Sequence, residues 1–217
     1  MMNIGSYNKL LILIGIIVLS LDVLATGQIS DKFHFEQKEY SLIGLKGDLI
    51  NPSKFGMETE PSSSANWRGY FSEYTVKNKK LFLSKMTVNA LPNSYVHING
   101  VEPDLEATKD CFMSGDKEIC TSDGAEYNNI NLVIPFTGKV RLGADFLREF
   151  YVHMGHQKPS AFKRVLDLEF NKGSLTRVID RSEEAKSIRG LFMRKYHNST
   201  SEKAVESAFS LTMEELQ

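Results

Sequence analysis

The chain has 217 residues, 26 lysines and arginines, 27 aspartates and glutamates, and a formal net charge of −1. This length suits one domain whose core needs neither a metal nor many disulfides for stability. The balanced charge and the lack of a basic stripe in the sequence argue against nucleic acid as a partner, because proteins that bind it gain much of their affinity by neutralising phosphates.

The first 25 residues have the pattern of a secretory signal peptide. Lys9 precedes the apolar run 10–21, and Val23 and Ala25 suit the positions before a signal-peptidase cut. The run is shorter than the roughly 20 apolar residues of a comfortable bilayer crossing. We therefore expect a signal peptide at 1–25 and one β-rich domain at 26–217, exported to the periplasm or secreted, without stable membrane insertion. The alternative is an uncleaved anchor at 10–25, with the domain still outside.

The body of the chain begins with a predicted hairpin. Segments 66–76 and 81–88 form its strands, and Asn78 and Lys79 form its turn. One face is expected to carry Tyr70, Tyr74, Val76, Leu81 and Leu83, and the other Phe71, Phe82 and Met86. Both faces are apolar, so other elements should cover each of them.

The two cysteines are expected to form a disulfide across a second hairpin. Gly115 and Asp116 suit a two-residue turn, which places Cys111 directly opposite Cys120. An oxidising compartment would close the bond, and its short loop should stabilise by about 2–3 kcal/mol. Two free thiols or a soft metal site are the alternatives, but two ligands make a poor zinc site. We expect no metal and no cofactor.

The second half continues with strands. Segments 130–136, 139–142 and 146–154 are candidates, and 166–170 pairs with 175–179 in a hairpin whose wet face carries Asp167 and Glu169.

The chain should end in an amphipathic helix at about 200–216, packed on the sheet or held for a partner. Residues 182–196 are ambiguous, because a capping box from Asp180 to Glu183 favours a helix and Gly190 disfavours one. The predicted class is mainly β, or α+β: antiparallel hairpins forming a sandwich or barrel-like sheet, with the C-terminal amphipathic helix packed on it.

No strong catalytic motif occurs, so no catalytic residue is assigned. The segment from Tyr151 to His156 is the most suggestive cluster. On a strand, Tyr151 and His153 point the same way, and Gly155 can bend the chain to bring His156 to the same rim. Such a group could bind a metal or polarise a substrate, but a metal site needs a third ligand. The alternative is a pair of structural histidines.

A second candidate ligand site is Trp67-Arg-Gly-Tyr70. Arg68 can grip a carboxylate with its planar fork, and the rings of Trp67 and Tyr70 can stack on a ligand. In a regular strand Trp67 and Arg68 point to opposite faces. Trp67 is then better explained as a core anchor.

These two segments together resemble a family of uncharacterised bacterial proteins with WRGY and YVHMG motifs. Phe136-Thr-Gly138 and the segment 166–173 are similar to the same pattern, and the resemblance spans roughly residues 38–175. It implies a shared β-rich fold and carries no activity. Members of the family often have an aromatic residue after the YVHMG glycine, where this chain has His156.

These observations predict an exported, non-enzymatic binding protein of the bacterial envelope, such as an inhibitor or immunity-type protein. Its partner would be another protein or a small ligand. One alternative is a hydrolase or metal-dependent enzyme that uses His153 and His156. The other is a structural envelope protein held by an uncleaved anchor.

Overall fold

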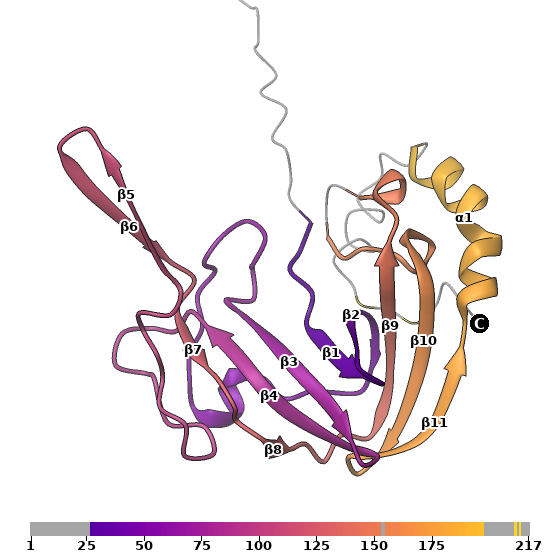
Figure 1. Ribbon diagram of the computed structural model, residues 1–217, viewed down its shortest axis with the longest axis horizontal. Helices are drawn as coiled ribbons and strands as arrows, with labels where there is room; N and C mark the ends of the chain where they lie inside the picture. Colours follow the sequence, from indigo (N-terminus) through magenta and orange to yellow (C-terminus); the bar gives the residue numbers. More distant parts are fainter. Residues whose placement is uncertain (1–26, 153–154, 198–210, 212, 214–217) are drawn as a thin grey trace, which may run out of the picture.

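The computed structural model describes residues 27–152, 155–197, 211 and 213, and of residues 190–197 the backbone only. Most of the described chain is β structure (Figure 1). A large sheet contains β1 (Lys32–Phe35), β2 (Lys38–Lys46), β3 (Tyr70–Lys77), β4 (Lys80–Val88), β7 (Ala125–Tyr127), β8 (Leu132–Val133), β9 (Gly138–Phe146), β10 (Phe162–Asn171) and β11 (Ser174–Asp180). A separate hairpin contains β5 (Lys109–Ser114) and β6 (Lys117–Ser122). The helical elements are η1 (Pro52–Phe55), η2 (Arg148–Phe150), η3 (Pro159–Ala161) and α1 (Ser182–His197).

The large sheet curls until its first strand, β11, pairs with β4. Its strands follow the order β11-β10-β9-β2-β1-β3-β4-β7, and β8 also pairs with β4. Only β1 and β3 run parallel among these pairs. Ser174 of β11, the first strand of this path, pairs with Lys80 of β4, the last strand but one. The main core lies inside the curl, where side chains such as Leu142, Leu168 and Leu83 are fully or almost fully buried. The predicted mainly β class is confirmed.

The β3–β4 hairpin has the predicted turn and register, with one exception. Val76 pairs with Leu81 and Tyr74 with Leu83, as expected. A bulge then leaves Ser84 without a partner, and its hydroxyl donates to the Glu73 carbonyl (2.8 Å). Because one extra residue moves all later side chains to the other face, Met86 lies in the main core. Its predicted place on the opposite face was wrong.

Two other strand predictions were also wrong. Of segment 130–136, only Leu132 and Val133 form a strand. Segment 146–154 is not a strand in its described part, because β9 runs through to Phe146 and η2 follows directly. The Leu147 N–H then bonds the Ala161 carbonyl (2.8 Å), which turns the chain towards β10.

Helix α1 resolves the ambiguity at 182–196 in favour of a helix. Asp180 accepts a hydrogen bond from the Ser182 N–H (2.9 Å), so it caps the first turn without the predicted box to Glu183. Ala185 faces β10, where it packs with Val165 and its neighbours. Of the helix predicted at 200–216, the described residues include Leu211 and Met213 alone, and neither is helical. Among the described residues, no helix is long and apolar enough to cross a bilayer.

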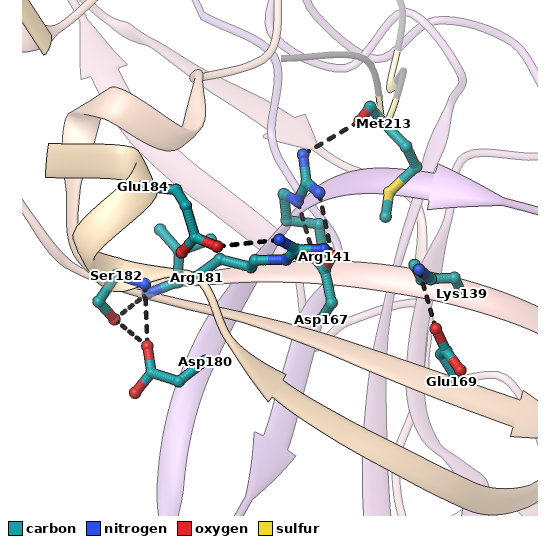
Figure 2. Close-up of polar contacts among 10 residues, drawn as sticks. Lys139, Arg141, Asp167, Glu169, Asp180, Arg181, Ser182, Glu184 and Met213 are labelled. Carbon is teal, nitrogen blue, oxygen red and sulfur yellow. Dashed lines mark hydrogen bonds and ion pairs between the residues drawn. The ribbon is translucent and has the colours of Figure 1, made fainter. Parts of the chain in front are cut away.

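Asp167 is buried on the outer face of β10, although the alternation of Asp167 and Glu169 predicted a wet position. It lies opposite Arg141 of β9, whose Nε and Nη2 donate to its two carboxylate oxygens at 2.7 and 3.0 Å (Figure 2). Arg141 also donates to the Met213 carbonyl (3.2 Å), so the C-terminal segment returns to this face. Arg181 closes the cluster from the side (3.4 Å). The prediction failed because these covering groups come from distant parts of the chain.

Candidate functional site

The two candidate motifs meet at the start of the described chain. The Gly27 N–H donates to the Tyr151 hydroxyl (3.1 Å), and the Gln28 N–H donates to the Gly155 carbonyl (2.8 Å). The Gln28 side chain in turn accepts from the Trp67 N–H (3.3 Å). Segments about 85 residues apart in sequence therefore lie on either side of one short stretch.

Arg68 grips a carboxylate, but the carboxylate belongs to the protein. Its guanidinium donates to both oxygens of Asp31, at 2.9 and 3.3 Å, and stacks over the Tyr70 ring, 4.7 Å from its centroid. Asp31 is buried and also accepts from the Ser72 N–H (2.9 Å). The predicted fork is thus occupied by a structural partner, and this pair fixes the chain before β1 against β3.

His156 is buried near the same pair, 6% exposed. Burial, followed by the positive charge of Arg68, lowers the pKa of His156 to about 4. Its Nδ1 has no hydrogen-bond partner among the described residues. A neutral imidazole of this pKa is a poor general base near pH 7, where efficient proton transfer needs a pKa close to the working pH.

Trp67 is not a core anchor, because its side chain is 64% exposed. The predicted strand begins only at Tyr70, and the residues before it form turns. Gly69 has a φ of +70°, and a Cβ there would lie 2.2 Å from the Glu60 carbonyl oxygen. This close approach fixes the turn and leaves Trp67 outside the sheet.

The predicted site residues are therefore brought together only in part. Arg68, Tyr70 and His156 share one neighbourhood, and Tyr151 reaches it through Gly27. His153 lies outside the described residues. Within the described chain, Cys111, Glu118 and Cys120 are the one cluster with metal-ligand spacing, and the disulfide occupies both sulfurs.

The second candidate site is the β5–β6 hairpin. Cys111 and Cys120 are paired and bonded, as predicted, and Ser114 faces Lys117 across the expected turn. Every residue of both strands is exposed, and the hairpin projects away from the large sheet (Figure 1). The sequence predicted the hairpin but not that all residues of its two strands would be exposed.

Three large apolar side chains are displayed on this hairpin. Phe112 and Ile119 are cross-strand partners on one face and are 52% and 41% exposed, while Met113 is 65% exposed on the other. Exposed apolar side chains that lie together make this hairpin a candidate interaction surface. The signal was present in the sequence, but only the structure shows that these residues have no core to enter.

The base of the hairpin is held by hydrogen bonds. The Thr108 hydroxyl donates to the Gly124 carbonyl and bonds the Ser122 hydroxyl (2.7 Å). Asp104 accepts from the N–H groups of Glu106 and Ala107 at 3.0 and 3.1 Å, which orders the approach to β5. Together with the disulfide, these contacts give the exposed strands a defined shape.

No family model, no curated protein and no solved structure matches this chain. The resemblance drawn from the WRGY and YVHMG motifs therefore stays a prediction.

Proposed function

We propose that the protein is an exported, non-enzymatic binding protein that grips a partner protein with the β5–β6 hairpin. One observation carries the proposal: a disulfide joins the two strands of a hairpin whose residues are all exposed, Phe112, Met113 and Ile119 among them. An isolated two-stranded hairpin is marginally stable in water. The disulfide keeps this hairpin ordered, as is expected if the hairpin binds a partner in a fixed shape.

A preordered hairpin suits an inhibitor or immunity-type protein. Binding with an already rigid element avoids much of the entropy loss of ordering a loop. The apolar pair Phe112 and Ile119 would enter a groove on the partner, and burying such side chains contributes roughly 1.5–3 kcal/mol each. The enzyme alternative has less support, because His156 is buried and neutral and Arg68 is already paired.

Export is part of the proposal. An exposed disulfide fits an oxidising extracellular compartment, and the first 25 residues have the signal-peptide pattern. The mature chain should then begin near Thr26, which N-terminal sequencing of protein from the envelope fraction tests. A chain still beginning at Met1 would favour the anchored alternative.

A capture experiment with matched variants tests the binding role. The wild-type protein and the Phe112→Ser/Ile119→Ser variant are tagged and incubated with envelope extract, and Val178→Ser serves as a control because Val178 is similarly exposed on β11. We expect a stoichiometric partner that the control retains and the hairpin variant binds more than 100-fold more weakly. Equal capture by all three would refute the hairpin as the binding element.

A further inference from the structure

Two turns that are far apart in sequence lie side by side at the end of the sheet where β4 meets β11 (Figure 1). The Leu81 N–H donates to the Gly173 carbonyl (2.9 Å), and the Leu175 N–H donates to the Lys79 carbonyl (2.8 Å). These bonds join the β3–β4 turn to the β10–β11 turn. The end of β2 is close by, because Lys46 pairs with Lys139 at the start of β9.

This end of the sheet concentrates positive charge, and we call it the lysine tip. It comprises segments 46–48, 77–80, 138–139 and 169–177. Its basic residues are Lys46, Lys77, Lys79, Lys80, Lys139, Lys172 and Arg177, and its acidic residues are Asp48 and Glu169. The whole chain carries a net charge of −1, so the positive charge is strongly segregated. Such segregation produces a local field that attracts anions.

Most lysines of the tip are available to an external partner. Lys46, Lys77, Lys79 and Lys172 are exposed, and none of them forms an ion pair among the described residues. Lys139 is bonded to Glu169 (2.9 Å).

A shallow groove of about 490 Å³ adjoins the tip and extends its basic surface. Lys46 and Lys139 line it together with Thr137 and Thr176. The Lys172 N–H donates to the Thr137 hydroxyl (2.9 Å), which ties the β10–β11 turn to this groove.

The residue types at the tip favour a lipid headgroup surface over a macromolecular partner in solution. Protein interfaces are enriched in aromatic residues and arginine and depleted in lysine. Single-stranded nucleic acids need aromatic side chains on which bases stack, and the one aromatic residue of the tip, Phe170, is buried. Lysines act as flexible point charges, which suits phosphates spread over a plane.

We propose that the lysine tip docks the domain on the anionic headgroup surface of a lipid bilayer. The β5–β6 hairpin lies away from the tip (Figure 1). Docking through the tip therefore leaves the hairpin open to a partner. The inference does not depend on the hairpin's role, since the two surfaces share no residue.

Sedimentation with lipid vesicles tests this. The exported protein, produced as the chain from Thr26 onward, is mixed with vesicles of phosphatidylcholine alone and of phosphatidylcholine with phosphatidylglycerol, at 0.05 and 0.5 M salt. The tip variant is Lys77→Gln/Lys79→Gln/Lys172→Gln. The control Lys109→Gln/Lys163→Gln/Lys186→Gln removes the same charge from exposed lysines elsewhere.

We expect salt-sensitive binding to the anionic vesicles that falls about 100-fold in the tip variant and little in the control. Equal binding to both kinds of vesicle, or an equal loss in both variants, would overturn the proposal. Soluble polyglutamate and duplex DNA form a third arm. If the protein binds either polyanion through the tip but does not bind vesicles, the ligand of the tip is a soluble polyanion and not a bilayer.

Discussion

Two cross-strand ion pairs on β9 and β10 allow a matched test of how burial changes the free energy of unfolding that is lost when an ion pair is broken. Arg141 and Asp167 are 1% and 0% exposed, whereas the side chains of Lys139 and Glu169, in register two residues away, are 27% and 29% exposed. Figure 2 shows both pairs. The same two strands thus hold one buried and one partly exposed pair.

Asp167→Asn removes the carboxylate and leaves the charge of Arg141 buried without its counter-ion. Breaking a buried pair in this way costs about 3–5 kcal/mol of unfolding free energy. Glu169→Gln breaks the exposed pair and should cost less than about 1 kcal/mol. Total stability of a domain is about 5–15 kcal/mol, so the first variant will lose a large part of it.

Urea unfolding of both variants measures the difference, read from the transition midpoints at an unchanged slope. The double variant Arg141→Met/Asp167→Leu is included in case Asp167→Asn does not fold. It replaces both charges by apolar groups, so no unpaired charge is buried, and it should regain most of the stability that Asp167→Asn loses. Equal costs for Asp167→Asn and Glu169→Gln would refute the reasoning from burial.

Three further predictions concern single features. The free energy of unfolding should fall by about 3 kcal/mol as the pH drops from about 6.5 to 4, because His156 is protonated in the unfolded chain over this range but stays neutral in the folded protein, where its pKa is about 4. Urea unfolding at a series of pH values measures this fall, and His156→Gln should reduce it. Cys111→Ser/Cys120→Ser should lower the free energy of local unfolding of the hairpin by about 2–3 kcal/mol. Hydrogen exchange of residues 109–122 should therefore accelerate, while the midpoint of global urea unfolding hardly moves. Trp67→Phe should change stability by less than about 0.5 kcal/mol, and native Trp67 fluorescence should already resemble that of an exposed indole.

Each of these has a contradicting result. Parallel pH curves for the wild type and His156→Gln would place the titration on another group. A large fall in the global midpoint without the disulfide would mean that the hairpin supports the sheet. Blue-shifted emission from Trp67 would place its ring in an apolar environment.

Local patterns predicted the hairpins well because their determinants are adjacent in sequence. Gly115 and Asp116 defined one turn and Asn78 and Lys79 another, and each turn set the pairing that the structure has. The prediction for Met86 failed because nothing in the sequence marks Ser84 as the residue of a bulge.

Features that depend on contacts between distant segments could not be predicted from local patterns. The burial of Asp167 depends on Arg141 and on Met213, which come from other strands and from the C-terminal segment. The lysine tip joins Lys79 and Lys172, which no local pattern connects. The sequence did not predict that the two candidate motifs lie next to each other, because no local pattern connects them. Nor did it show that Arg68 already has Asp31 as its partner.

Site-specific photo-crosslinking tests whether the β5–β6 hairpin contacts a partner. A photoreactive phenylalanine derivative replaces Phe112 in one protein and Glu183, exposed on α1, in a second. We expect one discrete crosslinked product from position 112 in the envelope and none of the same mass from position 183. Crosslinking at 183 alone, or the same product from both positions, would contradict it.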